Sequence, residues 1–88
     1  MNTYLIHIKG LVQGVGFRPF IFRVASEFNL NGEVENRNDG VFIKINCDEK
    51  TLKAFVNTVR NTAPPASSIE SIETGQTDFI DFSDFQIV

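Results

Sequence analysis

The spacing of apolar residues changes along this chain, and that change constrains the fold more than any other feature. Residues 4 to 9, YLIHIK, alternate side chains in the period of two expected of a strand with one buried face. From residue 17 to residue 28 the apolar positions recur at spacings of three and four, as in an amphipathic helix, and Asn31-Gly32 offers a stop. A strand followed at once by a helix is therefore expected.

The middle of the chain predicts a hairpin. Residues 33–37 and the run VFIKI flank Asn38-Asp39-Gly40, a sequence that tolerates the positive φ of a tight turn. A second helix should begin after Asp48, which can cap it, and end before Pro64-Pro65. These elements are followed by a strand over residues 69–74 and a last short strand over residues 85–88.

The segment between the last two strands combines turn residues with phenylalanines. We predict a loop that lays Phe79 and Phe82 on the core. The element order is then β-α-β-β-α-β with a short extra strand. This order predicts an α+β, ferredoxin-like split βαβ fold with an antiparallel sheet and both helices on one face. The 88 residues suffice for one domain, over residues 1–88.

Composition and charge exclude several classes of partner. The net charge is −3 and the eight Lys and Arg residues are scattered, so no basic stripe is available to bind nucleic acid. No apolar run has the length of a membrane span or the character of a signal peptide, and a cytoplasmic location without membrane binding is expected. Cys47 is the only cysteine, which excludes an intramolecular disulfide.

The segment VQGVGFRPF, residues 12 to 20, connects the first predicted strand to the first predicted helix. Glycines at 14 and 16 permit positive φ, which turns successive N–H groups toward one point, and the following helix adds its positive dipole end. The segment lacks the third glycine of a dinucleotide loop and the Gly-Lys-Ser/Thr of a Walker loop. It is either a site for a small phosphate or a plain strand-to-helix turn.

Arg18 and Pro19 mark the expected start of the helix. Proline suits the first helical position because it needs no N–H acceptor there, and it disfavours the helical conformation of the residue before it. We therefore expect Arg18 at the helix cap, with its guanidinium beside the loop amides. That planar fork of donors pairs bidentately with phosphate oxygens and stays charged at any relevant pH.

Two segments together resemble the acylphosphatase family. GLVQGVGFR is similar to the signature loop of that family, and GEVENRNDGVFIKI is similar to its second signature, in which an Asn precedes an Asp-Gly hairpin. The resemblance covers nearly the whole chain. Because RPF follows the loop, the chain resembles most the N-terminal acylphosphatase-like domain of HypF, the carbamoyltransferase of [NiFe]-hydrogenase maturation. The segment 65–68, PASS, departs from the pattern usual in that subfamily.

The resemblance implies hydrolysis of a carboxyl–phosphate anhydride, with carbamoyl phosphate as the natural candidate, without a metal or another cofactor. It implies that the other domains of a full-length carbamoyltransferase are partners. By the same resemblance Arg18 and Asn36 are catalytic: Arg18 grips the phosphoryl oxygens and Asn36 holds the attacking water. The remaining phosphate-binding groups are the backbone N–H groups of Gln13, Gly14, Val15, Gly16 and Phe17.

Other functions remain open at this point. The same loop could only capture carbamoyl phosphate or phosphate for other domains, or the chain could be a free-standing acylphosphatase. A split βαβ fold can also bind RNA, but VFIKI lacks the basic, aromatic-rich character of such strands. His7 is the only histidine, and we expect a partly exposed sheet residue rather than a general base.

Overall fold

The computed structural model describes all residues from 1 to 88. Its elements, in chain order, are β1 (Asn2–Leu11), α1 (Phe17–Glu27), β2 (Gly32–Arg37), β3 (Gly40–Cys47), α2 (Glu49–Thr62), β4 (Ser68–Thr77) and β5 (Phe85–Ile87). The predicted order of strands and helices is confirmed. The first and fourth strands are longer than their apolar alternation indicates, because both continue through polar and glycine residues at their ends.

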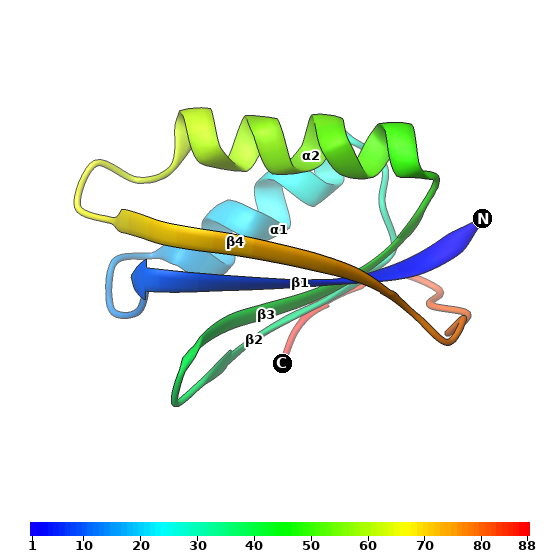
Figure 1. Ribbon diagram of the computed structural model, residues 1–88, viewed down its shortest axis with the longest axis horizontal. Helices are drawn as coiled ribbons and strands as arrows, with labels where there is room; N and C mark the ends of the chain where they lie inside the picture. The colour runs from blue at the N-terminus through cyan, green and yellow to red at the C-terminus, as the bar shows by residue number, and fades with distance from the viewer.

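The strands form one sheet in the order β4-β1-β3-β2-β5. The four longer strands are antiparallel, whereas β5 runs parallel to β2. Figure 1 shows α1 and α2 covering the same face of this sheet, while the other face is open. The ferredoxin-like prediction is confirmed, and its antiparallel description fails only for the short edge strand.

The core lies between this face and the two helices. Alternate residues of β1 and β3 point into it, including Ile6, Ile8 and Ile43, all of which are fully buried. Phe17 and Ile21 of α1 and Phe55 of α2 close it from above. Asp48 caps α2 as expected, accepting a hydrogen bond from the Thr51 N–H at 2.8 Å. None of the helices is long and apolar enough to cross a membrane.

The first helix begins where the apolar spacing predicted, but its predicted cap is wrong by two residues. The helix begins at Phe17, so Arg18 and Pro19 are its second and third residues, and the cap is Gly16 in the left-handed conformation. Proline fits here because none of the first-turn N–H groups has an acceptor within a helix. The steric bias of Pro19 against a helical Arg18 is overcome, since burial of Phe17 draws the first turn onto the core.

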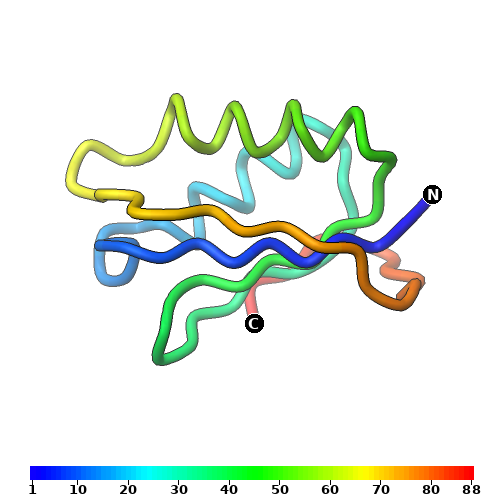
Figure 2. The backbone as a smooth tube through the Cα atoms, in the orientation of Figure 1, coloured from blue at the N-terminus to red at the C-terminus, as the bar shows by residue number.

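The predicted role of the 75–84 segment is also wrong in part. Phe79 is 56% exposed, and neither it nor Phe82 joins the core cluster. Both helices already cover the inner face of the sheet, so the chain has to travel from the β4 edge to the β5 edge around the strand ends (Figure 2). The backbone N–H of Ile80 donates to Thr3 Oγ1 at 2.9 Å and fixes this path.

The lone thiol of Cys47 closes β3 and is 5% exposed. Burial, with a smaller contribution from the Asp48 carboxylate, raises the pKa of Cys47 to about 11 from 9.0. The thiolate is the reactive form, so its population at neutral pH should be about 100-fold lower in the fold than in the unfolded chain. We expect slow alkylation by iodoacetamide in buffer and rapid alkylation in concentrated urea. Equal rates would contradict the burial of this thiol.

Candidate anion-binding and catalytic site

The loop between β1 and α1 turns on two glycines. Gly14 and Gly16 both have φ of 75°, the left-handed region that other residues rarely adopt. A Cβ added at either glycine would meet nothing within 4 Å, so the requirement for glycine is conformational rather than steric. The loop is thus shaped by its backbone and is open to an incoming ligand.

The amides of this loop have no acceptors in the fold. Outside the helices and strands, Val12 and Phe20 are the donors nearest the loop, and no backbone hydrogen bond uses the N–H groups of residues 13–16. The first turn of α1 adds further unpaired N–H groups, as any helix does, and contains no acidic residue. Backbone donors without acceptors beside a positive helix end favour a bound anion.

Arg18 supplies the fixed charge near this cluster. Its side chain is half-buried, and its Nη1 donates to the backbone oxygen of Val88 at 3.5 Å, a long and weak hydrogen bond. The guanidinium therefore lies near the end of β5. An anion in the loop offers it a charged, bidentate acceptor that a single carbonyl oxygen cannot match.

Asn36 lies on the helix-covered face of the sheet. It is two residues beyond the fully buried Val34 of β2, and alternate residues of a strand share a face. Its Oδ1 atom is buried and has no hydrogen-bond partner. Buried polar atoms nearly always have a partner, so an orphaned one indicates a missing water or ligand.

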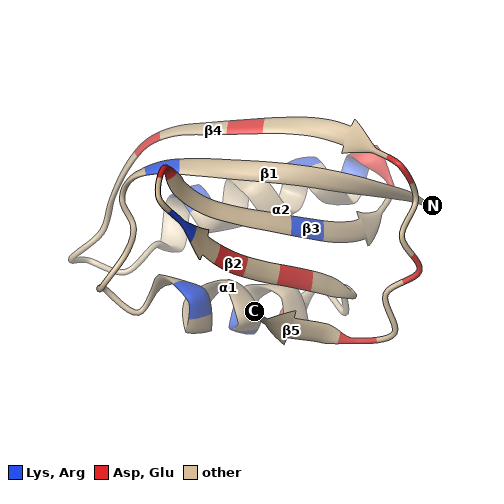
Figure 3. Cartoon of the chain, turned by 90° about the horizontal axis from the view of Figure 1, so that it is seen from below, with Lys and Arg blue, Asp and Glu red and all other residues tan.

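The fold brings Arg18 and Asn36 toward the same end of β2. Arg18 contacts Val88, and the Val88 N–H donates to the carbonyl oxygen of Val34 at 2.8 Å, two residues before Asn36. Figure 3 shows the C-terminus beside the first turn of α1 and along the β2 edge. Arg18 is therefore linked through Val88 to β2, two residues before Asn36.

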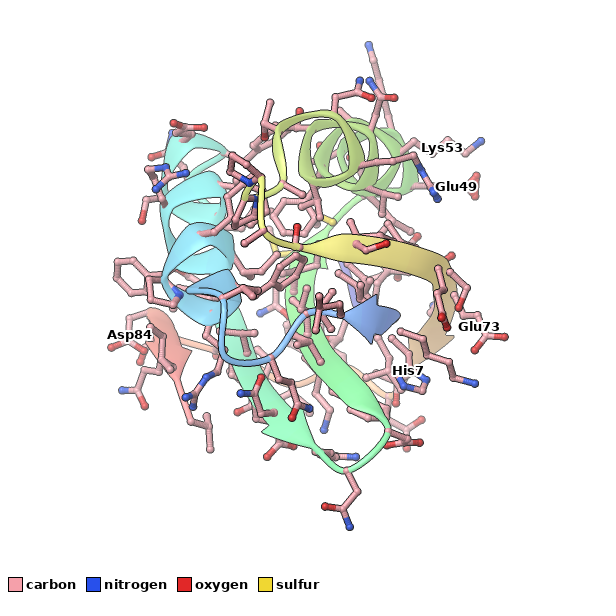
Figure 4. The ribbon with its side chains drawn as sticks, turned by 90° about the vertical axis from the view of Figure 1, so that its left-hand side faces the viewer. His7, Glu49, Lys53, Glu73 and Asp84 are labelled. Carbon is pink, nitrogen blue, oxygen red and sulfur yellow. The ribbon has the colours of Figure 1, made fainter.

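The side chain of Gln13 has a role that sequence reasoning missed. Its Nε2 donates to the carbonyl oxygens of Arg37 and Gly40, at 2.5 and 3.2 Å, on either side of the β2–β3 turn. Figure 4 looks onto this end of the molecule, where the β1–α1 loop passes above the hairpin. No local pattern identifies such a bond, because it joins residues 24 and 27 positions apart.

His7 lies on the opposite, open face of the sheet. Its ring stacks on Phe42 with centroids 4.0 Å apart, and its Nε2 is 2.8 Å from the carbonyl oxygen of Asp39. Figure 4 shows its side chain near Glu73, on the neighbouring strand. This structural role agrees with the interpretation of His7 as a sheet residue, and the sheet separates it from Asn36.

The nearest sizeable cavity does not contain the two predicted catalytic residues. It has a volume of about 480 Å³, lies beside the hairpin turn, and is lined by Lys9, Gln13, Asp39 and Glu70 among others. Its two acidic side chains make it a poor place for a phosphate. The candidate site consists instead of the free backbone N–H groups of residues 13–16 and the Arg18 side chain.

Comparisons with known proteins identify the family of this chain. A sequence profile of the acylphosphatase family matches residues 4–87. The carbamoyltransferase HypF of Synechocystis sp. is 43% identical over 70 residues, which cover 80% of this chain and 9% of that protein. The acylphosphatase of Thermotoga petrophila is 44% identical over 70 residues, which cover 78% of this chain and 77% of that protein.

Solved structures give the same two kinds of relative. A crystal structure of full-length HypF in its phosphate- and nucleotide-bound form matches 99% of this chain and 12% of its own, at 38% identity and a TM-score of 0.93. The acylphosphatase from Bacillus subtilis matches 100% of this chain and 99% of its own, at 38% identity and a TM-score of 0.89. The chain thus spans less than a tenth of the first curated HypF relatives and most of the small acylphosphatases. It belongs to the acylphosphatase family.

Proposed function

We propose that this domain hydrolyses a carboxyl–phosphate anhydride at the β1–α1 loop, with carbamoyl phosphate as the natural substrate. The domain would act as the N-terminal part of a hydrogenase-maturation carbamoyltransferase. Support comes from the family, from the similarity to HypF and from the unpaired amides beside Arg18. The HypF crystal structure that the fold matches holds phosphate.

In the proposed reaction the protein mainly neutralises the charge of the phosphoryl group and aligns the attacking water with it. A carboxylate is a good leaving group, and the transition state of phosphoryl transfer carries charge on its three equatorial oxygens. In our proposal the N–H groups of residues 13–17 and the Arg18 guanidinium are positioned to stabilise the charge on those oxygens in the transition state. The carboxylate leaves readily without further activation, so the proposal includes no metal.

The single observation that carries hydrolysis rather than binding is the orphaned Oδ1 of Asn36. A purely phosphate-binding site gains nothing from a buried acceptor, because an acceptor repels phosphate oxygens. A hydrolytic site needs one acceptor to hold a water. The Asn36 oxygen can accept from that water while its NH₂ group donates to the phosphoryl group, and a carboxylate there would repel the substrate.

The decisive assay is turnover of benzoyl phosphate and carbamoyl phosphate by the purified 88-residue chain. We expect saturable release of phosphate and competitive inhibition by inorganic phosphate. Phenyl phosphate is the matched control substrate: it keeps the ring and the phosphoryl group but has a poor leaving group, and it should not be hydrolysed.

The same assay distinguishes the second candidate function, a non-catalytic binding module. That candidate is favoured by the small share of the HypF relatives that this chain spans. Calorimetry measures phosphate binding beside the turnover assay. Saturable binding of phosphate without turnover of either acyl phosphate would show that the domain captures the ligand for other domains and does not hydrolyse it. Absence of both binding and turnover would remove the loop as a site.

A further inference from the structure

The side chain of Gln13 is the direct polar link between the phosphate loop and the hairpin that carries Asn36. Its Nε2 contacts two carbonyl oxygens, those of Arg37 and Gly40. Arg37 is the last residue of β2 and Gly40 is the first residue of β3. The Gln13 side-chain amide therefore contacts both strands where they enter the turn. The loop and the turn are thereby held together at one point.

This link lies next to the residue that the proposed mechanism depends on. Arg37 follows Asn36 directly, and Asn36 pairs with Val41 across the hairpin. A hydrogen bond to the Arg37 carbonyl therefore fixes the end of β2 within one residue of the carboxamide. A displacement of the turn away from the loop would carry Asn36 with it.

The turn has a second anchor, which acts from another direction. His7 of β1 holds the Asp39 carbonyl oxygen on the open side of the sheet, and Gly40 approaches the β1 backbone so closely that a Cβ there would lie 2.3 Å from the Ile8 oxygen. These contacts fix the turn to β1. They do not fix it to the loop of residues 13–16, whose own amides make no contact with the hairpin.

We infer that Gln13 is a positioning residue: its side chain sets the distance between the anion held by the loop amides and the water held by Asn36. The inference rests on the proposed function and assigns to the Gln13 side chain a role separate from the phosphate contact expected of its backbone N–H. The side-chain amide is engaged by the hairpin carbonyls and does not bind the phosphate.

The expected effect follows from how sharply phosphoryl transfer depends on alignment. A misplacement of about 1 Å between reacting groups costs about 100-fold in rate, while the loop amides and Arg18 still bind the anion. Loss of the Gln13 link should therefore lower kcat and leave KM and the phosphate Kd nearly unchanged. Removal of a binding group would instead raise both constants.

Gln13→Met is the sharpest variant, because it keeps length and neutrality and removes both hydrogen-bond donors. Gln76→Met is the matched control. Gln76 is likewise exposed and its side-chain amide donates one hydrogen bond, to Asn2 Oδ1 at 3.3 Å, but it lies on the edge strand β4. We expect kcat for benzoyl phosphate to fall about 10- to 100-fold in Gln13→Met and not in Gln76→Met, with phosphate binding within about twofold of the parent in both.

A second readout is independent of turnover. Phosphate added to the isotope-labelled parent protein should shift the amide signal of Gly40, which lies in the hairpin, as well as those of the loop. In Gln13→Met the loop signals should shift as before while the Gly40 response disappears.

The outcomes separate the two proposals. If the parent turns over and Gln13→Met keeps its kcat, the positioning role is overturned and the proposed function stands. If kcat, phosphate affinity and melting temperature fall together, Gln13 is only structural and the inference is likewise overturned. If the parent does not turn over acyl phosphates, the proposed function fails, and an unaltered Gly40 response in Gln13→Met then overturns the link as well.

Discussion

Arg18→Ala should lower kcat/KM for benzoyl phosphate by about 10² to 10³, the usual cost of removing one preorganised donor from a developing oxyanion. Phosphate affinity should fall with it, because the guanidinium is the only side-chain cation that we assign to the loop. Stability should change little, since the side chain makes a single hydrogen bond, at 3.5 Å, to the Val88 backbone. Steady-state kinetics, phosphate calorimetry and thermal melting measure the three quantities.

Arg23 offers the matched control for this substitution. It lies on the same helix, and its guanidinium sits over the Phe20 ring, with Cζ 5.5 Å from the ring centroid. Arg23→Ala therefore removes the same charge from α1 without touching the site, and it should keep full turnover. Equal losses of kcat/KM in both variants would show that Arg18 acts only through its contribution to the charge of α1. Near-parental turnover in Arg18→Ala would show that the Arg18 side chain has no part in catalysis.

Asn36→Ala should lower kcat by about 10² to 10³ while phosphate binding persists, because the carboxamide is assigned to the water and not to the ground-state anion. The fold should not be weakened. The Oδ1 atom is buried without a partner, so its removal relieves a desolvation cost and breaks no hydrogen bond of that atom. We therefore expect Asn36→Ala to lose turnover while its melting temperature equals or exceeds that of the parent, as kinetics and thermal melting can measure.

Two further variants sharpen this second prediction. Asn36→Asp keeps the shape but adds a negative charge, and it should weaken phosphate binding as well as turnover. Asn57→Ala removes an exposed carboxamide from α2, far along the chain from the site, and should leave both unchanged. Loss of phosphate binding in Asn36→Ala would show that Asn36 holds the anion itself.

Much of this fold follows from local patterns. The alternation around Ile6 and the spacing around Phe20 and Ile21 define β1 and α1, because one face of each must be buried. Asn38-Asp39-Gly40 defines the hairpin, since its turn needs residues that tolerate such a backbone. The positions of Arg18 and Asn36 follow from the same elements, as both lie at the ends of predicted segments.

What could not be predicted depends on contacts between distant residues. The helix begins before Pro19 because Phe17 is buried under tertiary packing that the sequence does not display. Phe79 stays exposed because the inner face of the sheet is already covered, which depends on the complete arrangement of helices. The Gln13 bonds and the unpartnered Asn36 oxygen likewise appear only once the loop and the hairpin are side by side.

The proposed mechanism depends most on one arrangement, in which the loop amides and Arg18 bind the same tetrahedral anion opposite Asn36. A crystal structure of this chain with inorganic phosphate tests it most directly. We predict phosphate oxygens within hydrogen-bond distance of the N–H groups of residues 14–17, the Arg18 guanidinium moved from Val88 onto the anion, and a water on Asn36 Oδ1. Phosphate bound elsewhere, or a guanidinium that stays on Val88 with the loop occupied, would contradict the account.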